Sequence, residues 1–198
     1  MFADGHVDIG PRFVNGKWTV QVRDDTTRPP VWRDTEDVVM HVVDAAKTQV
    51  PGGQQFSFLG SPGSPVWVLP QVQQPGVLWP GWNTQDPQVA AVVNREVTWR
   101  LRKATGPGRF VLFVNGEFGA PQVIFDGSRQ QVQQTGIDLN THAHGNWAFT
   151  APGTYLLDIE MNARTAEGQQ LGDRRLLRVF VGPGAPNAAF NVPAPPGF

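Results

Sequence analysis

The chain has 198 residues and a formal net charge of -1, with 16 Lys and Arg against 17 Asp and Glu, so it lacks the basic surface that nucleic acids or anionic membranes attract. Its 22 Gly and 18 Pro argue against long helices. With no cysteine it has no disulfide and no thiolate ligand, so any metal must be held by His, carboxylate or amide groups.

Alternation of apolar and polar residues with a period of two predicts strands in the first fifty residues. Trp18, Val20 and Val22 fall on one face of such a segment. The Asn15-Gly16 dipeptide before them favours the positive φ of a tight hairpin turn. A second apolar run, Val38–Val43, predicts another strand.

The segment from Pro51 to Pro87 breaks this regularity, because seven prolines in it are interleaved with Trp67, Trp79 and Trp82. We expect a long, ordered excursion with one or two short strands that covers a sheet edge or builds a site. The tryptophans are interpreted as core residues, since large aromatic side chains prefer burial. A surface that stacks on sugars or binds a partner is the alternative.

The second half again alternates at a period of two. The apolar faces of its expected strands are Val97, Trp99 and Leu101; then Phe110–Val114, followed by the Asn115-Gly116 turn; then Tyr155, Leu157, Ile159 and Met161; and finally Leu177, Val179 and Val181. The last two strands, separated by Glu167-Gly168, predict a closing hairpin. Phe149–Leu157 resembles the entry to the penultimate strand of many immunoglobulin-like domains.

We therefore predict an all-β fold, an antiparallel immunoglobulin-like β-sandwich of about nine strands that carries the Pro/Trp-rich excursion. Residues 1–181 form this single domain. Residues 182–198, rich in Pro, Gly and Ala, are expected to be an extended linker tail.

The His142-Ala143-His144 triplet is the sharpest chemical pattern in the sequence, because residues i and i+2 of a strand point to the same face. His6-Val7-Asp8 repeats the spacing with an imidazole and a carboxylate. Together they predict a site for zinc, which takes three or four N and O ligands, with Asp8 either a ligand or the acceptor that orients His6. The alternative is an exposed histidine pair and a frayed N-terminus.

His41 has two interpretations of equal weight: a satisfied core histidine, or a further ligand in a partly dry site. Enzymatic patterns are weaker. The Asp24-Asp25 pair points to opposite faces if extended, and no nucleophile elbow or phosphate-binding glycine loop is present. We expect a binding protein rather than an enzyme.

Several longer strings resemble the actinobacterial surface-anchored repeat domain, also called the choice-of-anchor M domain. They are Gly5–Pro11, Phe58–Gly60, Val66–Gln71, Leu78–Thr84, Gly106–Gly108 and His142–Phe149. The resemblance covers nearly the whole chain. It implies an exported module, single or repeated in wall-anchored proteins and associated with metal-type ABC transporters. Because the chain carries no export signal, sortase signal or terminal membrane helix, we expect it to be one domain of such a protein.

The resulting hypothesis is an extracellular, cell-surface or cell-wall module that captures a divalent metal ion and relays it toward an ABC-type uptake system, whose substrate-binding protein would be the partner. Zinc is favoured over manganese, which prefers more oxygen ligands. Two alternatives stay open: a structural or adhesive wall module that binds carbohydrate or protein through its Trp/Pro segment, and a haem-capture domain with a histidine axial ligand.

Overall fold

The computed structural model describes residues 1–116 and 119–198. The strands of this part of the chain are β1 (Gly5–Val14), β2 (Lys17–Asp24), β3 (Val31–Asp34), β4 (Val39–Val42), β5 (Lys47–Gln49), β6 (Pro65–Leu69), β7 (Leu78–Asn83), β8 (Glu96–Thr105), β9 (Phe110–Asn115), β10 (Pro121–Asp126), β11 (Gln133–Asp138), β12 (His142–His144), β13 (Asn146–Phe149), β14 (Gly153–Arg164) and β15 (Gln170–Val181). The helices are short: α1 (Pro87–Val92) and the 3-10 turns η1 (Thr35–Asp37), η2 (Asp44–Ala46), η3 (Gln54–Leu59) and η5 (Pro186–Asn191).

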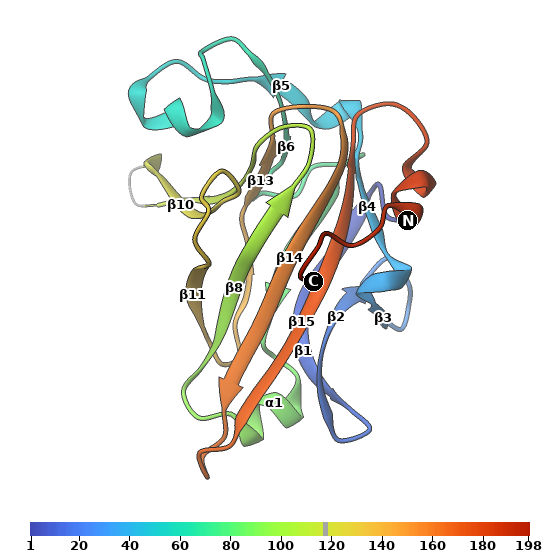
Figure 1. Ribbon diagram of the computed structural model, residues 1–198, viewed down its shortest axis with the longest axis vertical. Helices are drawn as coiled ribbons and strands as arrows, with labels where there is room; N and C mark the ends of the chain where they lie inside the picture. The colour runs from blue at the N-terminus through green and yellow to red at the C-terminus, as the bar shows by residue number, and fades with distance from the viewer. Residues whose placement is uncertain (117–118) are drawn as a thin grey trace.

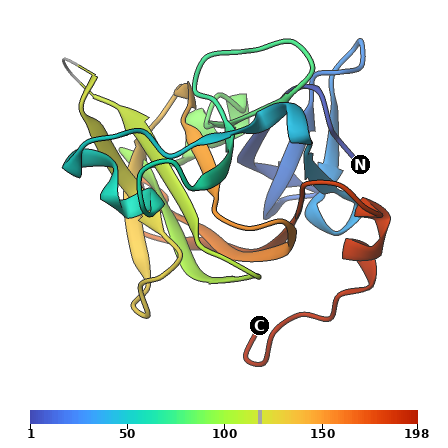
Figure 2. The same ribbon diagram turned by 90° about the horizontal axis from the view of Figure 1, so that it is seen from above.

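The strands form three five-stranded sheets, in the orders β12-β7-β1-β2-β3, β10-β9-β13-β6-β5 and β11-β8-β14-β15-β4. The last of these is one layer of a sandwich, and the other two lie behind it in Figure 1 and separate to either side in Figure 2. Trp99 of β8 joins the layers, since its ring lies 5.5 Å from that of Trp82 in β7 and 6.2 Å from that of Trp147 in β13. The expected all-β sandwich is confirmed, with three sheets in place of the two of an immunoglobulin domain.

The residues with a period of two are buried as predicted. Trp18, Val20 and Val22 of β2 lie in the main core, as do Trp99 and Leu101 of β8. Asn15 and Gly16 both have positive φ and form the tight β1–β2 hairpin. Strands β14 and β15 make the closing hairpin along their whole length.

The start of β14 has the tyrosine corner that is typical of such sandwiches. Tyr155 is fully buried, and its hydroxyl donates to the Ala151 carbonyl oxygen at 2.8 Å. The same oxygen accepts from the Ala151 amide at 3.2 Å. The Pro152-Gly153 turn is thereby tied to the strand that follows it.

One continuous stretch of chain connects the two smaller sheets. His142–His144 pairs with β7 as β12, and after Gly145 the chain continues as β13 between β9 and β6. A Cβ at Gly145 would lie 3.1 Å from the Phe113 carbonyl oxygen and 3.3 Å from the Trp82 ring, so glycine allows this close crossing. Since Trp147 and Phe149 are core residues, the packing of β13 sets the position of β12.

The Pro51–Pro87 excursion is structured throughout, with η3, β6 and β7 in it. Leu59 and Val66 from this segment pack with Val111 and Phe113 in a second apolar cluster on one sheet. Trp67 and Trp82 are buried, as the core interpretation predicts, whereas Trp79 is only half-buried.

The expected linker tail is not wholly extended. Within it η5 packs against β15 and β4, and Ala189 is fully buried. The prediction from composition missed this because Gly and Pro content reports backbone stiffness and not the apolar contact of a single alanine.

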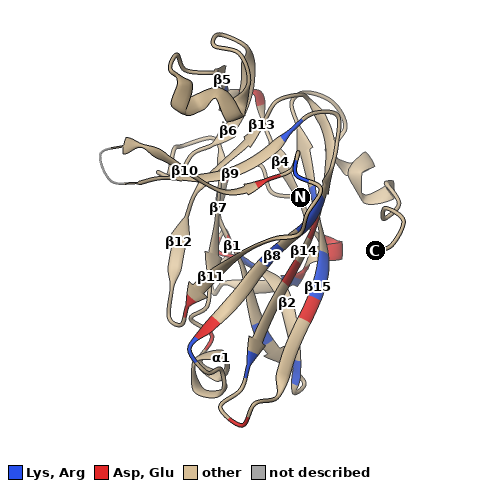
Figure 3. Cartoon of the chain, turned by 60° about the vertical axis from the view of Figure 1, so that its left-hand side comes forward, with Lys and Arg blue, Asp and Glu red and all other residues tan. Residues whose placement is uncertain are grey.

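Charged residues of both signs alternate along the outer face of β8, β14 and β15 (Figure 3). Arg174 makes a two-pronged ion pair with Asp158, and Arg102 donates to Glu160 at 2.8 Å. Among the described residues, no helix has the length and apolar character needed to cross a bilayer.

Candidate metal centre

The candidate site lies on the outer face of the sheet β12-β7-β1-β2-β3, with β7 in the middle. On one side β1 runs parallel to β7 and aligns His6 with Trp79 and Asp8 with Gly81. On the other side β12 runs antiparallel and aligns His144 with Gly81. Because Val7 and Ile9 alternate into the core, His6 and Asp8 must face outward.

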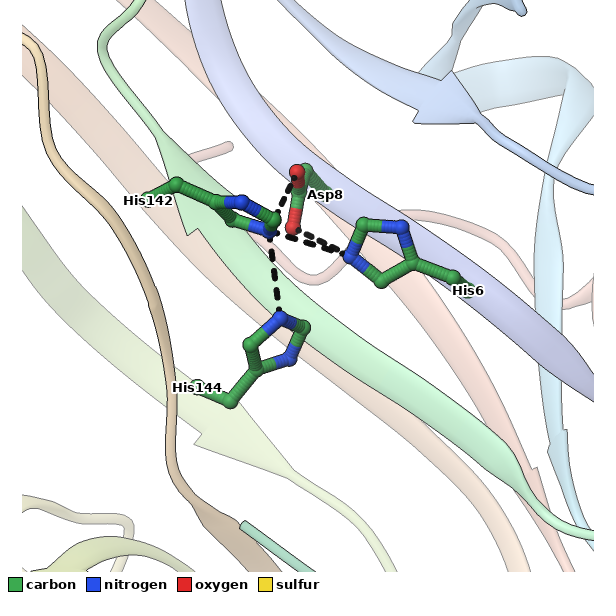
Figure 4. Close-up of side chains that lie close together, drawn as sticks. All are labelled: His6, Asp8, His142 and His144. Carbon is green, nitrogen blue, oxygen red and sulfur yellow. Dashed lines mark hydrogen bonds and ion pairs between the residues drawn. The ribbon is translucent and has the colours of Figure 1, made fainter. Parts of the chain in front are cut away.

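Three imidazoles and one carboxylate converge at this place (Figure 4). The Nε2 atom of His142 lies 3.1 Å from Nε2 of His6 and 3.1 Å from Nε2 of His144. Asp8 places Oδ1 3.2 Å from His6 Nε2 and Oδ2 3.1 Å from His142 Nε2. One ligand atom from each of the four residues fits within 4.8 Å of all the others.

These contacts cannot all be hydrogen bonds. His142 Nε2 has three polar neighbours at 3.1 Å, and a single imidazole nitrogen offers either one proton or one lone pair. The spacing does match the edges of a coordination polyhedron, since ligands bound tetrahedrally at zinc–nitrogen distances lie about 3.3 Å apart. A shared cation would satisfy all of the nitrogens at once.

Asp8 is the buried anchor of the cluster. Its side chain is 0% exposed, and Oδ1 accepts no hydrogen bond within the described part of the chain. Asn83 holds the other oxygen, with Nδ2 donating to Oδ2 at 3.1 Å. Burial would raise the Asp8 pKa, but the contacts with His6 and Asn83 and the positive charges of His6 and His142 lower it. Asp8 is therefore an anion at neutral pH with one oxygen free to bind a metal.

His6 is oriented from behind by a second carboxylate. Its Nδ1 atom lies 2.8 Å from Asp25 Oδ2, and Asp25 is itself paired with Arg23 at 3.2 Å. Burial would lower the His6 pKa, but Asp8 and then Asp25 raise it overall. A carboxylate on the far nitrogen directs the Nε2 lone pair at the site, which is the usual support for a metal-binding histidine.

His144 is held by an aromatic surface. Its ring stacks on Trp79 with centroids 3.6 Å apart and an interplanar angle of 6°. The Trp79 indole is fixed in turn, because Nε1 donates to the Gln71 carbonyl oxygen at 3.0 Å. Burial lowers the pKa of His144 to about 4, Asp8 opposes this, and the charges of His6 and His142 add to the lowering. His144 is thus neutral, as metal binding requires.

Gly81 forms the floor of the cluster. A Cβ there would overlap Asp8 Oδ1 and would lie 2.7 Å from both the Ala143 carbonyl oxygen and His144 Cε1. Its φ lies outside the left-handed region, so space rather than backbone conformation demands glycine.

The structure brings together four of the five predicted residues, namely His6, Asp8, His142 and His144. His41 does not join them and is corrected as a ligand candidate. It lies on β4 in a different sheet, where Nε2 is 3.0 Å from the Gly182 carbonyl oxygen and the ring packs edge-on against Phe180. The satisfied histidine was the right interpretation.

Four supporting residues were missed from the sequence: Asp25, Trp79, Gly81 and Asn83. Only the strings containing them were noted. A strand of alternating Trp79, Gly81 and Asn83 could have indicated one polar face, but its place between β1 and β12 depends on how the excursion folds back.

No family model, curated protein or solved structure matches this chain. The family resemblance and all that it implies remain predictions, and the geometry is considered below on its own.

Proposed function

We propose that this protein binds one divalent metal ion, with zinc preferred, through His6, Asp8, His142 and His144. The observation that carries the proposal is the convergence of three Nε2 atoms on a fully buried carboxylate whose Oδ1 accepts no hydrogen bond in the described residues. Burial of an anion is costly unless a cation compensates it, and a metal ion does so completely.

The donor set favours zinc over manganese. Zinc takes imidazole nitrogens and carboxylate oxygens in four-coordinate sites, and three nitrogens with one oxygen is such a set. Manganese prefers a majority of oxygen ligands. Copper and nickel also suit imidazole, so they serve as competitors in the test below.

The haem alternative fits the site poorly. An axial histidine needs open space beside its Nε2 for the flat macrocycle, and here each Nε2 has another nitrogen 3.1 Å away. The adhesive alternative loses most of its stacking surface, because Trp67 and Trp82 are buried and the half-buried Trp79 is already stacked on His144.

The biological setting of the binding rests on the family resemblance. On that basis we place the module at the cell surface or in the cell wall, where it captures the ion and passes it to the substrate-binding protein of an ABC-type uptake system.

The test is a zinc titration of protein purified without a histidine tag, with bound metal and melting temperature as readouts. We expect one zinc per chain and a melting temperature that rises with zinc, because the ion binds the folded state. His6→Ala and His142→Ala should lose most of this effect. His41→Ala is the matched control, since it removes an imidazole that lies outside the cluster.

If His6→Ala and His142→Ala keep the wild-type stoichiometry and zinc-dependent stabilisation, the site is wrongly placed and the adhesive function takes precedence. Titrations with manganese, copper and nickel under the same conditions rank the ions.

A further inference from the structure

The four ligands differ in how firmly they are held, and this difference rests on the metal site proposed above. Asp8 is fixed by Asn83, His6 by Asp25 and His144 by the Trp79 ring. Among residues 1–116 and 119–198, His142 makes no hydrogen bond or ion pair outside the cluster itself.

Exposure follows the same order. The Asp8 side chain is 0% exposed and that of His6 is 17% exposed, whereas His142 is 35% exposed. The solvent-facing side of the cluster is therefore the His142 side.

The position of His142 in the fold adds a third asymmetry. Strand β12 has three residues and forms the edge of its sheet, with β7 as its neighbour. His6 and Asp8 lie on β1, which is paired on both sides by β2 and β7. A side chain on a short edge strand can swing away at less cost than one on a strand with two neighbours.

We infer that His142 is the exchangeable ligand of the site, through which the ion enters and leaves. His6, Asp8 and His144 form a rigid three-point seat. An incoming imidazole or carboxylate group approaches from the exposed side and takes the position of His142 before the ion departs. The metal is then never without four ligands during transfer, which makes exchange with an acceptor faster than spontaneous release.

The test compares His142→Ala with His144→Ala, which remove the same group from an exposed and an enclosed position. Both variants are titrated with cobalt(II), with and without millimolar imidazole, and the visible absorption of the ion reports its coordination. We expect imidazole to restore affinity at least tenfold in His142→Ala and to have little effect in His144→Ala, where Trp79 and Gly81 enclose the vacated space.

Equal rescue of both variants, or rescue of neither, overturns the inference while leaving the metal site in place. A wild-type protein that binds no metal overturns both proposals. If His142→Ala does not fold, zinc-loaded wild type is mixed with increasing EDTA. A transfer rate that rises in proportion to EDTA supports ligand exchange at the exposed position, and a rate independent of EDTA contradicts it.

Discussion

Replacing Gly81 by alanine should abolish tight zinc binding without removing any ligand. The new methyl group would overlap Asp8 Oδ1 and approach His144 Cε1 to 2.7 Å. Asp8 is fully buried and held by Asn83, and His144 is stacked on Trp79, so neither side chain can retreat freely. The ligands must therefore separate, and the coordination geometry is lost.

The size of the effect follows from the linkage between binding and stability. Zinc at about 100 times its Kd stabilises the wild type by about 2.7 kcal/mol. For a chain of this length each kcal/mol corresponds to roughly 2–4 °C, so the melting temperature should rise by about 5–11 °C. A loss of about 100-fold in affinity, the upper range for disturbed metal support, leaves a stabilisation of about 0.4 kcal/mol and a shift of about 1 °C.

The assay is thermal melting of both proteins with and without zinc. Gly52→Ala is the matched control, because a Cβ at that position meets no atom within 4 Å. Without zinc the Gly81→Ala protein should still unfold cooperatively, at a temperature lowered by at most the usual cost of overpacking, about 1–3 kcal/mol. A Gly81→Ala protein that keeps the full zinc-dependent shift would refute the placement of the ion above Gly81.

Three further outcomes are expected. Asp25→Asn, which weakens the support of the His6 Nδ1 atom, should lower zinc affinity about 10–100-fold in calorimetry with little loss of fold; unchanged affinity would mean that Asp25 does not orient the ligand. Because its two carboxylate neighbours raise the His6 pKa above 6.5, protons compete with zinc below that raised pKa, so affinity should fall as pH drops from 8 to 6 and binding near pH 7 should release protons, measurable in buffers of different ionisation enthalpy; pH-independent affinity would contradict ligation by His6. Tyr155→Phe removes the hydrogen bond to Ala151 and should cost about 0.5–1.5 kcal/mol of unfolding free energy in urea while zinc affinity stays constant; a change in affinity would mean that the corner and the site are coupled.

Local patterns predicted much of the fold because period-two burial is a local property. Trp18, Val20 and Val22 needed only an inside and an outside to be placed correctly. The hairpin at Asn15-Gly16 needed only the backbone preferences of two residues. The division into three sheets depends instead on where the Pro51–Pro87 segment returns to the sandwich, and no local pattern contains that information.

The ligands could be proposed from the sequence because each pair shares a strand face. The expectation that the two pairs lie on neighbouring strands was wrong, since β7 separates β1 from β12. Gly81 is the reason that four ligands still meet across the intervening strand, because the absent side chain leaves the space between them. A missing side chain has no pattern of its own, so this part of the site required the structure.

The distance along the chain between the ligands gives the ion a further effect on the molecule. His6 and His142 are separated by 136 residues, so a metal held between them closes a loop that includes most of the chain. The chain has no cysteine and hence no covalent bridge of its own. A bound ion would act as a reversible cross-link of the kind that disulfides provide in many secreted domains, and a chelator would release it as a reductant releases a disulfide.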